Sequence, residues 1–458
     1  MINIHELPEE EVLKLRLQTT HFNIHYNDQK KYRKIVDELC LIVPVLHCRK
    51  EVLCIVTNVA RALGSKAKSL SIPKMKKCYT NNAQKISWSK MCAVLDYLSE
   101  NGYLVGYRGG FLRDMSSKIL SIYVFTDKLT NMFKGVDTSK EIDYHPLVVI
   151  KDRATGEIKS SRGVAGCGEI TKKLQKYNNV LKTAKITFNG VDLPYQIYFR
   201  SFSDNTITCG RFYNTVGGIQ TMSQKQRSEL KINGEDVVEL DFKAMHPSIL
   251  YEWKWQDEPE RVEKWIDFMF NGDYDPYKVT VGSKLLEVDE SLVLEYKIKH
   301  DLRKYDPLRN LIKYCVMVSL NASNHMAACR ALTDEFYSEV KKWGKEDTGE
   351  FKYYGIINPK DFNNVKTFPA SFFCTACMNA NRPIQEYFYQ DKGVDLQFTD
   401  SEIMFRVLNS LAEIGEPAFS EHDSVIVRKS IKAQAKQLLR DAYFSVVGSD
   451  KFCIIEEK

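Results

Sequence analysis

The sequence has no apolar run long enough to span a bilayer, and it shows no signal peptide. It also lacks internal repeats and low-complexity tracts. Its twelve cysteines are scattered, and only Cys374 and Cys377 form a CxxC pair. A structural zinc site needs a second such pair, so we expect buried thiols here. These absences predict a soluble protein of a reducing compartment, the cytoplasm.

Acidic residues are missing from 52–95, although the whole chain of 458 residues carries a net charge of only +6. The same window contains eight basic residues: Arg61, Lys66, Lys68, Lys74, Lys76, Lys77, Lys85 and Lys90. A solvated face and a nucleic-acid contact both explain such an imbalance. The chain is long enough for two or three domains with their own cores.

The order of elements over 86–125 is typical of a winged helix. Ser87 can cap a helix whose apolar residues recur at helical spacing over 91–98. A strand at 103–105, a glycine-rich turn at 108–110 and a second strand at 119–125 follow. In a winged helix the helix enters the major groove and the wing touches the DNA backbone. The alternative is a helix and hairpin that only pack, but the basic window favours DNA binding, with contacts from Lys85, Lys90 and Arg108.

Residues 135–165 are rich in glycine, serine and charge, which predicts a linker or an arm. A basic amphipathic helix is expected over 169–186. The remaining chain, from about Ile186, contains the residues that could form an active site.

The stretch "VVELDFKAMHPSILY" (237–251) places a carboxylate at the tip of an interior strand. Val237, Glu239 and Asp241 share one face, because side chains alternate along a strand. A carboxylate there is costly unless a cation or a donor meets it, although an aspartate capping the helix near Pro247 is an alternative. We expect Glu239 to be solvated rather than to support Asp241.

A second carboxylate has a similar setting. The stretch "EPAFSEHDSVIVRKS" predicts a hairpin with His422 and Asp423 at its tip, preceded by a helix that Gly415 ends. Magnesium is held by one or two carboxylates plus substrate phosphates. Two such ions about 4 Å apart can clamp the attacking and leaving oxygens of a displacement at phosphorus.

Between the two carboxylates lies a helix with two cations on one face. Asp306 can cap it, and Pro307 suits its first turn. Arg309 and Lys313 are four residues apart and project together, which suits a triphosphate. Two surface cations are the plainer alternative. The order carboxylate strand, cationic helix, carboxylate hairpin favours the triphosphate.

These three segments resemble motifs A, B and C of the superfamily that joins A-family DNA polymerases and phage-type single-subunit RNA polymerases. "ELDFKAMHPSILY" is similar to motif A, "RNLIKYCVM" to motif B, and "HDS" to motif C. "TITCGRFYN" is similar to the T/DxxGR element, with its threonine one place out of register. The resemblance covers about residues 205–430.

The resemblance implies roles for individual residues. Asp241 and Asp423 would hold two Mg²⁺ ions, for which Mn²⁺ can substitute, and the carbonyl of Phe242 would be a further ligand. Lys313 and Arg309 would meet the triphosphate, and Lys313 would also protonate the departing pyrophosphate. His422 would orient the primer end, and Arg211 would brace the template–product duplex.

Two departures from the family pattern concern the nucleotide's sugar. His246 stands five residues after Asp241, where A-family DNA polymerases usually have glutamate and the RNA enzymes a small residue. A ring there can exclude the 2′-hydroxyl by bulk or accept a ribose by hydrogen bonding. Asn321 and Ala322 stand where motif B usually carries an aromatic residue and a glycine. The choice between deoxyribose and ribose therefore stays open.

The expected fold is α+β: a right-hand polymerase with an antiparallel palm sheet and helical fingers and thumb, preceded by a winged-helix-like domain. The expected divisions are an unassigned segment (1–50), the winged-helix-like domain (51–134), a linker (135–165), thumb and upstream palm elements (166–235), motif A (236–254), fingers with motif B (255–392), and palm with motif C (393–458).

The expected function is template-directed addition of nucleotides to a 3′-hydroxyl on a DNA template. A DNA polymerase or primase of a mobile element or phage is favoured, and a compact DNA-directed RNA polymerase is the alternative. Rivals from other classes are a non-catalytic DNA-binding replication initiator and a two-metal nuclease. The expected partners are primed or single-stranded DNA, nucleoside triphosphates and a helicase or accessory protein. No exonuclease constellation is visible, which argues against proofreading.

Overall fold

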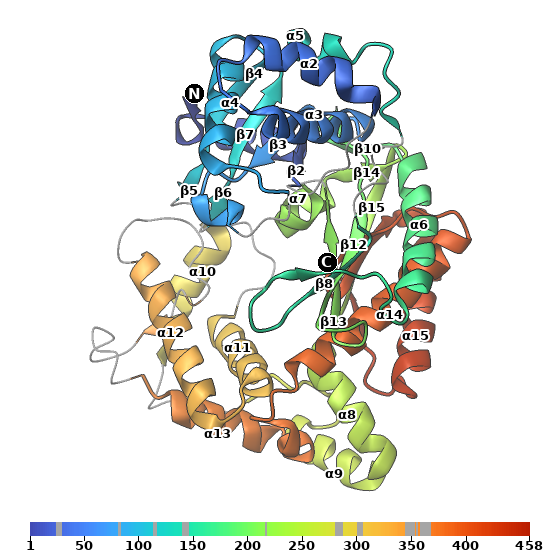
Figure 1. Ribbon diagram of the computed structural model, residues 1–458. Coiled ribbons are helices and arrows are strands. Elements are labelled where there is room, and N and C mark those ends of the chain that lie inside the picture. Colours follow the sequence, from blue (N-terminus) through green and yellow to red (C-terminus); the bar gives the residue numbers. More distant parts are fainter. Residues whose placement is uncertain are drawn as a thin grey trace.

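The computed structural model combines helices with mainly antiparallel sheets, which confirms the α+β class (Figure 1). The residues it describes are 1–23, 30–80, 84–112, 117–139, 146–215, 218–279, 287–299, 306–343, 353, 356–357 and 368–458. Across these ranges, none of the helices combines the length and the apolar character that crossing a membrane requires.

The N-terminal unit is built on a five-stranded sheet in the order β1-β4-β7-β3-β2 and lies at the top of Figure 1. Its helices pack on this sheet around a core of their own, which runs from Tyr32 to Phe133. Its elements are β1 (Ile2–Asn3), α1 (Glu9–Leu17), β2 (Thr19–His21), α2 (Arg33–Ile42), α3 (Arg49–Gly64), β3 (Ser69–Ile72), α4 (Trp88–Glu100), β4 (Leu104–Arg108), β5 (Gly110–Leu112), β6 (Ser117–Ile119), β7 (Ser121–Phe125) and α5 (Asp127–Thr130).

The helix and the two strands expected over 86–125 are present as α4, β4 and β7, whereas the β5–β6 pair, which begins within the expected turn at 108–110, was not predicted. The Ser87 hydroxyl accepts a hydrogen bond from the N–H of Lys90, so the predicted cap is confirmed. The apolar face of α4 is buried in the core, as its spacing requires. The role of these elements as a DNA-binding winged helix stays a prediction.

Part of the expected linker is sheet. β8 (Val148–Lys151) runs parallel to β12 (Tyr198–Ser203) and pairs on its other side with β9 (Ile158–Lys159). With β13 (Cys209–Asn214) these strands form a sheet in the order β13-β12-β8-β9. The prediction of a linker over the whole of 135–165 is therefore wrong, because the apolar Val148, Val149 and Ile150 are buried against the rest of the molecule.

The central sheet carries both carboxylate motifs. Its order is β11-β10-β14-β15-β19-β18, and β20 pairs with β15 as well. The members are β10 (Ile186–Phe188), β11 (Val191–Asp192), β14 (Leu230–Ile232), β15 (Glu235–Phe242), β18 (Phe419–Glu421), β19 (Ser424–Arg428) and β20 (Ile455–Glu457). Every pairing in it is antiparallel, and β15 is an interior strand with partners on both sides.

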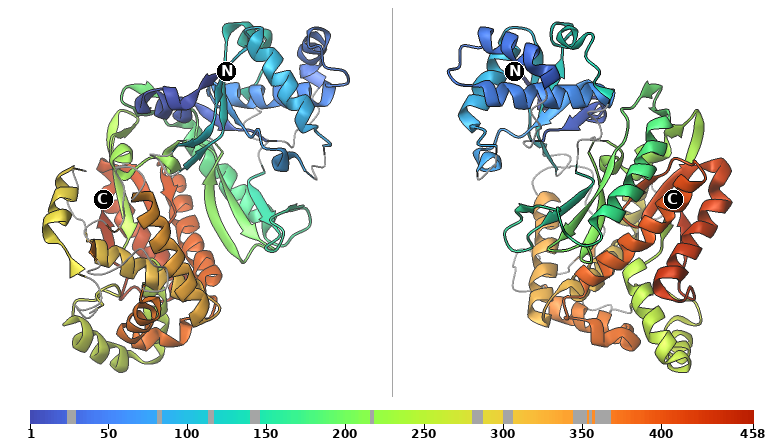
Figure 2. Two further views of the ribbon diagram at one scale, coloured as in Figure 1. Left: turned by 90° about the vertical axis from the view of Figure 1, so that its left-hand side faces the viewer. Right: turned by 45° about the vertical axis from the view of Figure 1, so that its right-hand side comes forward.

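Helices cover this sheet on one side and build a separate group beyond its edge (Figures 1 and 2). α14 (Gly393–Glu413) packs against α15 (Lys432–Val447) and α6 (Cys167–Thr183). The other group holds α8 (Met245–Asp257), α9 (Pro259–Phe270), α10 (Glu290–Lys299), α11 (Pro307–Asn321), α12 (His325–Trp343) and α13 (Ala370–Ala380). One continuous core joins both groups to the sheet.

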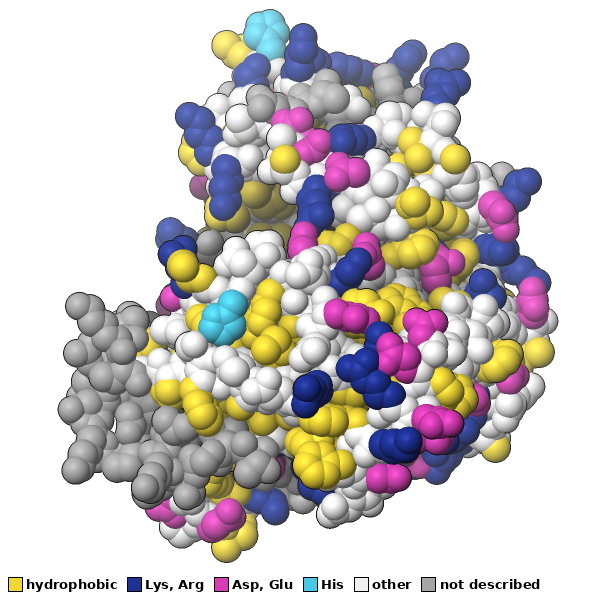
Figure 3. All heavy atoms as spheres, turned by 90° about the horizontal axis from the view of Figure 1, so that it is seen from below, with side chains coloured by type: hydrophobic (Ala, Val, Ile, Leu, Met, Phe, Trp, Pro, Cys, Tyr) yellow, Lys and Arg dark blue, Asp and Glu magenta, His cyan; other side chains and the backbone are white. Residues whose placement is uncertain are grey.

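Two predictions within the second group are confirmed. Asp306 caps α11, since its Oδ1 accepts from the N–H of Arg309 at 2.9 Å. Cys374 and Cys377 lie on α13 and are fully buried as free thiols. The face seen from below in Figure 3 mixes basic and acidic side chains, and α8 and α9 contribute ion pairs such as Lys254 with Glu258. The described part of this face therefore carries both signs of charge.

Candidate active site

Asp241 and Asp423 lie at the same end of two neighbouring strands. Asp241 pairs with Ser424 in the β15–β19 ladder, and the N–H of Phe242 donates to the carbonyl of Asp423 at 3.3 Å. His422, at the hairpin tip, has a φ of 53°, the left-handed conformation that a tight turn requires. Burial and the nearby charge of Asp423 raise the pKa of Asp241 to about 6. The two carboxylates are thus close enough to repel each other.

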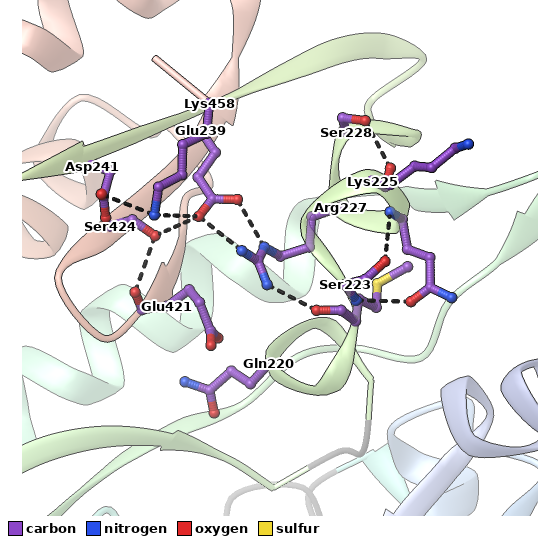
Figure 4. Close-up of polar contacts among 12 residues, drawn as sticks. Gln220, Ser223, Lys225, Arg227, Ser228, Glu239, Asp241, Glu421, Ser424 and Lys458 are labelled. Atoms are coloured by element: carbon purple, nitrogen blue, oxygen red, sulfur yellow. Dashed lines mark hydrogen bonds and ion pairs between the residues drawn. The ribbon is translucent and has the colours of Figure 1, made fainter. Parts of the chain in front are cut away.

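The side chain of Lys458 also reaches this site (Figure 4). Its Nζ lies 2.9 Å from Oδ2 of Asp241 and 4.0 Å from Oε1 of Glu239. The position is fixed by backbone pairing, because β20 runs beside β15 and the N–H of Lys458 donates to the carbonyl of Glu239 at 3.0 Å. Nothing in the sequence pattern near Lys458 indicated this contact, which depends on a strand far from motif A.

Glu239 is buried, not solvated, so that expectation is wrong. Its side chain is 6% exposed and receives two bonds from Arg227 of α7 (Gln224–Ser228), from Nε at 2.8 Å and Nη2 at 3.0 Å. The hydroxyl of Ser424 donates to the same carboxylate at 2.9 Å, as Figure 4 shows. The guanidinium compensates the buried charge of Glu239, which lies on the same strand as Asp241.

Glu421 is a third carboxylate of the site that sequence reasoning missed. It ends β18, two residues before Asp423, and its Oε2 is buried without a hydrogen-bond partner in the described part of the chain. Burial raises its pKa to about 7; Glu239 and Asp423 add to the shift, while Arg227 opposes it. The sequence offered one signal for it, an acidic residue two positions before Asp423 in the predicted hairpin.

These carboxylates could bind a divalent cation, although the described residues do not already form a set of metal ligands. Among the described residues, no three His, Cys, Asp or Glu side chains are already grouped as metal ligands. However, Oδ1 of Asp241 and Oε2 of Glu421 are both buried and unpartnered there. Magnesium needs only one or two carboxylates when phosphates complete its shell. Phe242 is buried against Tyr443, with ring centroids 5.7 Å apart, at the same strand end.

Helix α11 presents the two predicted cations differently. Lys313 is exposed, and its charge lowers the pKa of Asp241, which opposes the stronger effects of burial and Asp423. Arg309 is engaged: its Nη1 lies 2.9 Å from Oδ1 of Asp275, and its guanidinium lies over the ring of Tyr277. Lys313 is therefore the cation that remains available for an incoming anion.

Two residues of the segment after α9 also belong to this site and were not predicted. The Asp275 carboxylate lies between Arg309 and Lys243, whose Nζ is 3.8 Å away. Burial, and then the charge of Asp423, raise the pKa of Tyr277 well above its usual range. The tyrosine hydroxyl therefore stays protonated next to the carboxylates.

Asn321 lies at the far end of α11 from Arg309. Its amide donates to the carbonyl of Met317 at 2.6 Å. A Cβ at position 393 would lie 1.5 Å from its Oδ1, so a larger residue there would require the Asn321 side chain to move. Twelve residues of helix separate it from Arg309, roughly 18 Å. The structure does not bring Asn321 to the carboxylates among the contacts it describes.

His246 and Arg211 meet on a single carboxylate of α14. Oδ2 of Asp400 lies 2.8 Å from Nε2 of His246 and 3.1 Å from Nη2 of Arg211. Burial and the charge of Arg211 lower the pKa of His422, while the charges of Asp423 and Asp400 oppose this shift. Two predicted residues, His246 and Arg211, are thus connected through Asp400, which the sequence did not single out.

The predicted DNA contacts lie in the N-terminal unit. Lys85 and Arg108 are exposed, and Lys85 has a φ of 54°. Lys90 is partly engaged, because its Nζ donates to the carbonyl of His47 at 3.0 Å. Lys85 and Arg108 are therefore the better candidates for a phosphate contact.

No family model matches the chain, and no curated protein matches it. Among solved structures, it is similar to the POL domain of Pol1 from M. smegmatis in complex with DNA primer-template and dNTP. The match has 11% sequence identity and a TM-score of 0.27, and it covers 93% of this chain and 71% of that chain. A TM-score of this size supports no conclusion about this protein.

Proposed function

We propose that this protein is a template-directed nucleotidyltransferase, a polymerase that adds nucleotides to a 3′-hydroxyl on a DNA template. One observation carries the proposal: Asp241 and Asp423, 182 residues apart in the chain, meet at one end of a buried sheet, and their charges interact. Bringing two acids together in a buried place is unfavourable without a cation. The available ammonium of Lys313 acts on the same site from α11.

Each of these residues has a separate role in the proposed reaction. Asp241 and Asp423 would hold two Mg²⁺ ions, or Mn²⁺, which supply charge stabilisation on the reacting phosphate oxygens. Lys313 binds the triphosphate and protonates the departing pyrophosphate, while Arg309 supports the helix end that faces it through Asp275. His422 orients the primer end from the hairpin tip. Most of the rate would come from positioning and charge stabilisation.

The N-terminal unit would hold the template. Lys85 and Arg108 are exposed on it, and its order of elements suits a winged helix. Joined to a catalytic unit without an exonuclease, it favours a compact DNA polymerase or primase over a proofreading enzyme. A DNA-directed RNA polymerase uses the same carboxylates and the same lysine, so the sugar of the nucleotide decides between the two.

The test is extension of a primed DNA template in which dNTPs and NTPs are offered separately, with Mg²⁺ or with EDTA. We expect extension by one of the two nucleotide sets, and only with the cation. Degradation of the DNA without nucleotides would instead show a nuclease. Template binding without extension or Mg²⁺-dependent nucleotide binding would show a non-catalytic initiator.

A further inference from the structure

Asp400 connects the first turn of α8 to strand β13 through its contacts with His246 and Arg211. It projects from α14, and its side chain is 3% exposed. One oxygen, Oδ2, serves both the ring of His246 and the guanidinium of Arg211. The guanidinium of Arg211 supplies the opposite charge that a carboxylate this deeply buried requires.

The contact fixes the tautomer of the histidine. An ionised carboxylate only accepts hydrogen bonds, so Nε2 of His246 must carry the proton that points at Asp400. In the neutral ring, Nδ1 is then a bare acceptor. The His246 residue is 5% exposed, and its Nδ1 is buried with no partner among the residues that the structure describes.

A buried acceptor without a donor is unfavourable, and a ligand hydroxyl would satisfy it. His246 lies in the first turn of α8, five residues after Asp241, so its ring is next to the place where a nucleotide bound at that carboxylate must lie. Selectivity by the bulk of the ring alone would need neither a fixed tautomer nor a buried acidic partner.

We infer that Asp400 is a positioning residue that fixes His246 as the acceptor for a sugar hydroxyl of the incoming nucleotide. The inference rests on the proposed function and deepens it, because it names the group of the substrate that the enzyme recognises. Nucleotide analogues lacking the 2′- or the 3′-hydroxyl distinguish the two hydroxyls that could fill this role.

The tautomer is tested without any reaction. In protein labelled with ¹⁵N-histidine, with His246 assigned through H246Q, the Nε2 signal should be that of a protonated nitrogen and the Nδ1 signal that of a bare one. Asp400→Leu removes the acceptor for the Nε2 proton, so we expect the tautomer with the proton on Nδ1 to gain population. A bare Nε2 in the wild type, or identical spectra in both proteins, overturns the inference.

Kinetics test the ligand. In D400L, KM for the nucleotide that carries the recognised hydroxyl should rise roughly ten-fold, as for one lost hydrogen bond to a buried group. KM for the analogue that lacks this hydroxyl should not change. The control is Asp395→Leu, which changes an exposed aspartate of the same helix that pairs with Lys392. D395L should behave as wild type with every nucleotide.

The outcomes separate this inference from the proposed function. An equal rise of KM for all nucleotides, or a change in kcat alone, would show a structural role for Asp400 and would overturn the inference while leaving the polymerase intact. A wild type that neither extends DNA nor binds nucleotide with Mg²⁺ would overturn both. Asp400→Glu, which keeps an acceptor for Nε2, should retain the wild-type ratio of KM values if the variant folds.

Discussion

Nζ of Lys458 lies 2.9 Å from Oδ2 of Asp241, so a candidate metal ligand is held by the lysine that follows the neighbouring strand β20. The lysine side chain is 34% exposed, whereas that of Asp241 is 13% exposed. Such a pair lowers the cost of a buried carboxylate, and it also competes with any cation for the same oxygen. The strength of cation binding therefore depends on how readily Lys458 leaves.

Replacing Lys458 with methionine should tighten Mn²⁺ binding roughly ten-fold, because removing one ion pair frees Oδ2 of Asp241. Calorimetric titration with Mn²⁺ measures this directly. The matched control is Lys451→Met, which breaks the pair with Glu263 at 3.1 Å, elsewhere on the surface. Unchanged or weaker binding in K458M would show that the ammonium does not compete.

The raised pKa of Glu421, about 7, predicts a stability that depends on pH. The folded state holds this proton where the unfolded chain has lost it, so stability falls as the pH rises from about 4 to about 7. Glu421→Gln should raise the thermal midpoint by about 2 °C at pH 8 and leave it unchanged at pH 4. Thermal unfolding without divalent cations is the measurement, and Glu413→Gln on α14 is the control. An equal gain at both pH values would contradict the assignment.

The pair of Glu239 and Arg227 should show the asymmetry of a buried salt bridge. Glu239→Ala leaves the guanidinium buried and unpaired, which should cost about 3 kcal/mol of unfolding free energy. Replacing Glu239 by alanine and Arg227 by methionine together should cost much less, since no charge is left alone. Urea unfolding of the two single variants and the double variant gives the coupling energy. Additive losses would mean that the two side chains do not depend on each other.

Lys85 and Arg108 should contribute to DNA affinity through phosphate contacts. Each change to glutamate should weaken binding and should lower the slope of log affinity against log salt by about 1. Lys34 on α2, whose side chain is 88% exposed, provides the control K34E. Fluorescence anisotropy with a labelled duplex at several salt concentrations measures both quantities. A loss equal to that of K34E would place the DNA elsewhere.

Local signals predicted the elements well and predicted long-range contacts poorly. The caps at Ser87 and Asp306, the hairpin around His422 and the strand that carries Asp241 follow from residue type and spacing over a few positions. The carboxylate pair followed because both acids occupy strand ends.

The contacts that were missed all join distant segments. The sequence around Glu239 does not predict its contact with Arg227, and the sequence around Asp241 does not predict its contact with Lys458. Each contact depends on which strand or helix packs alongside. The same holds for Asp400, because nothing in the sequence of α14 distinguishes it from the other polar residues of that helix. Strand β8 was taken for a linker because charged and glycine-rich neighbours outnumber its few apolar residues.

Binding of Mn²⁺, followed by electron paramagnetic resonance in wild type, D241N, D423N and the double variant, tests most directly whether the two aspartates share a cation. Asp236→Asn, on the same strand but exposed and paired with Lys231, is the matched control. We predict that each single change abolishes tight binding, that the double variant is no worse, and that D236N binds as wild type does. Tight binding retained by either D241N or D423N would contradict the account.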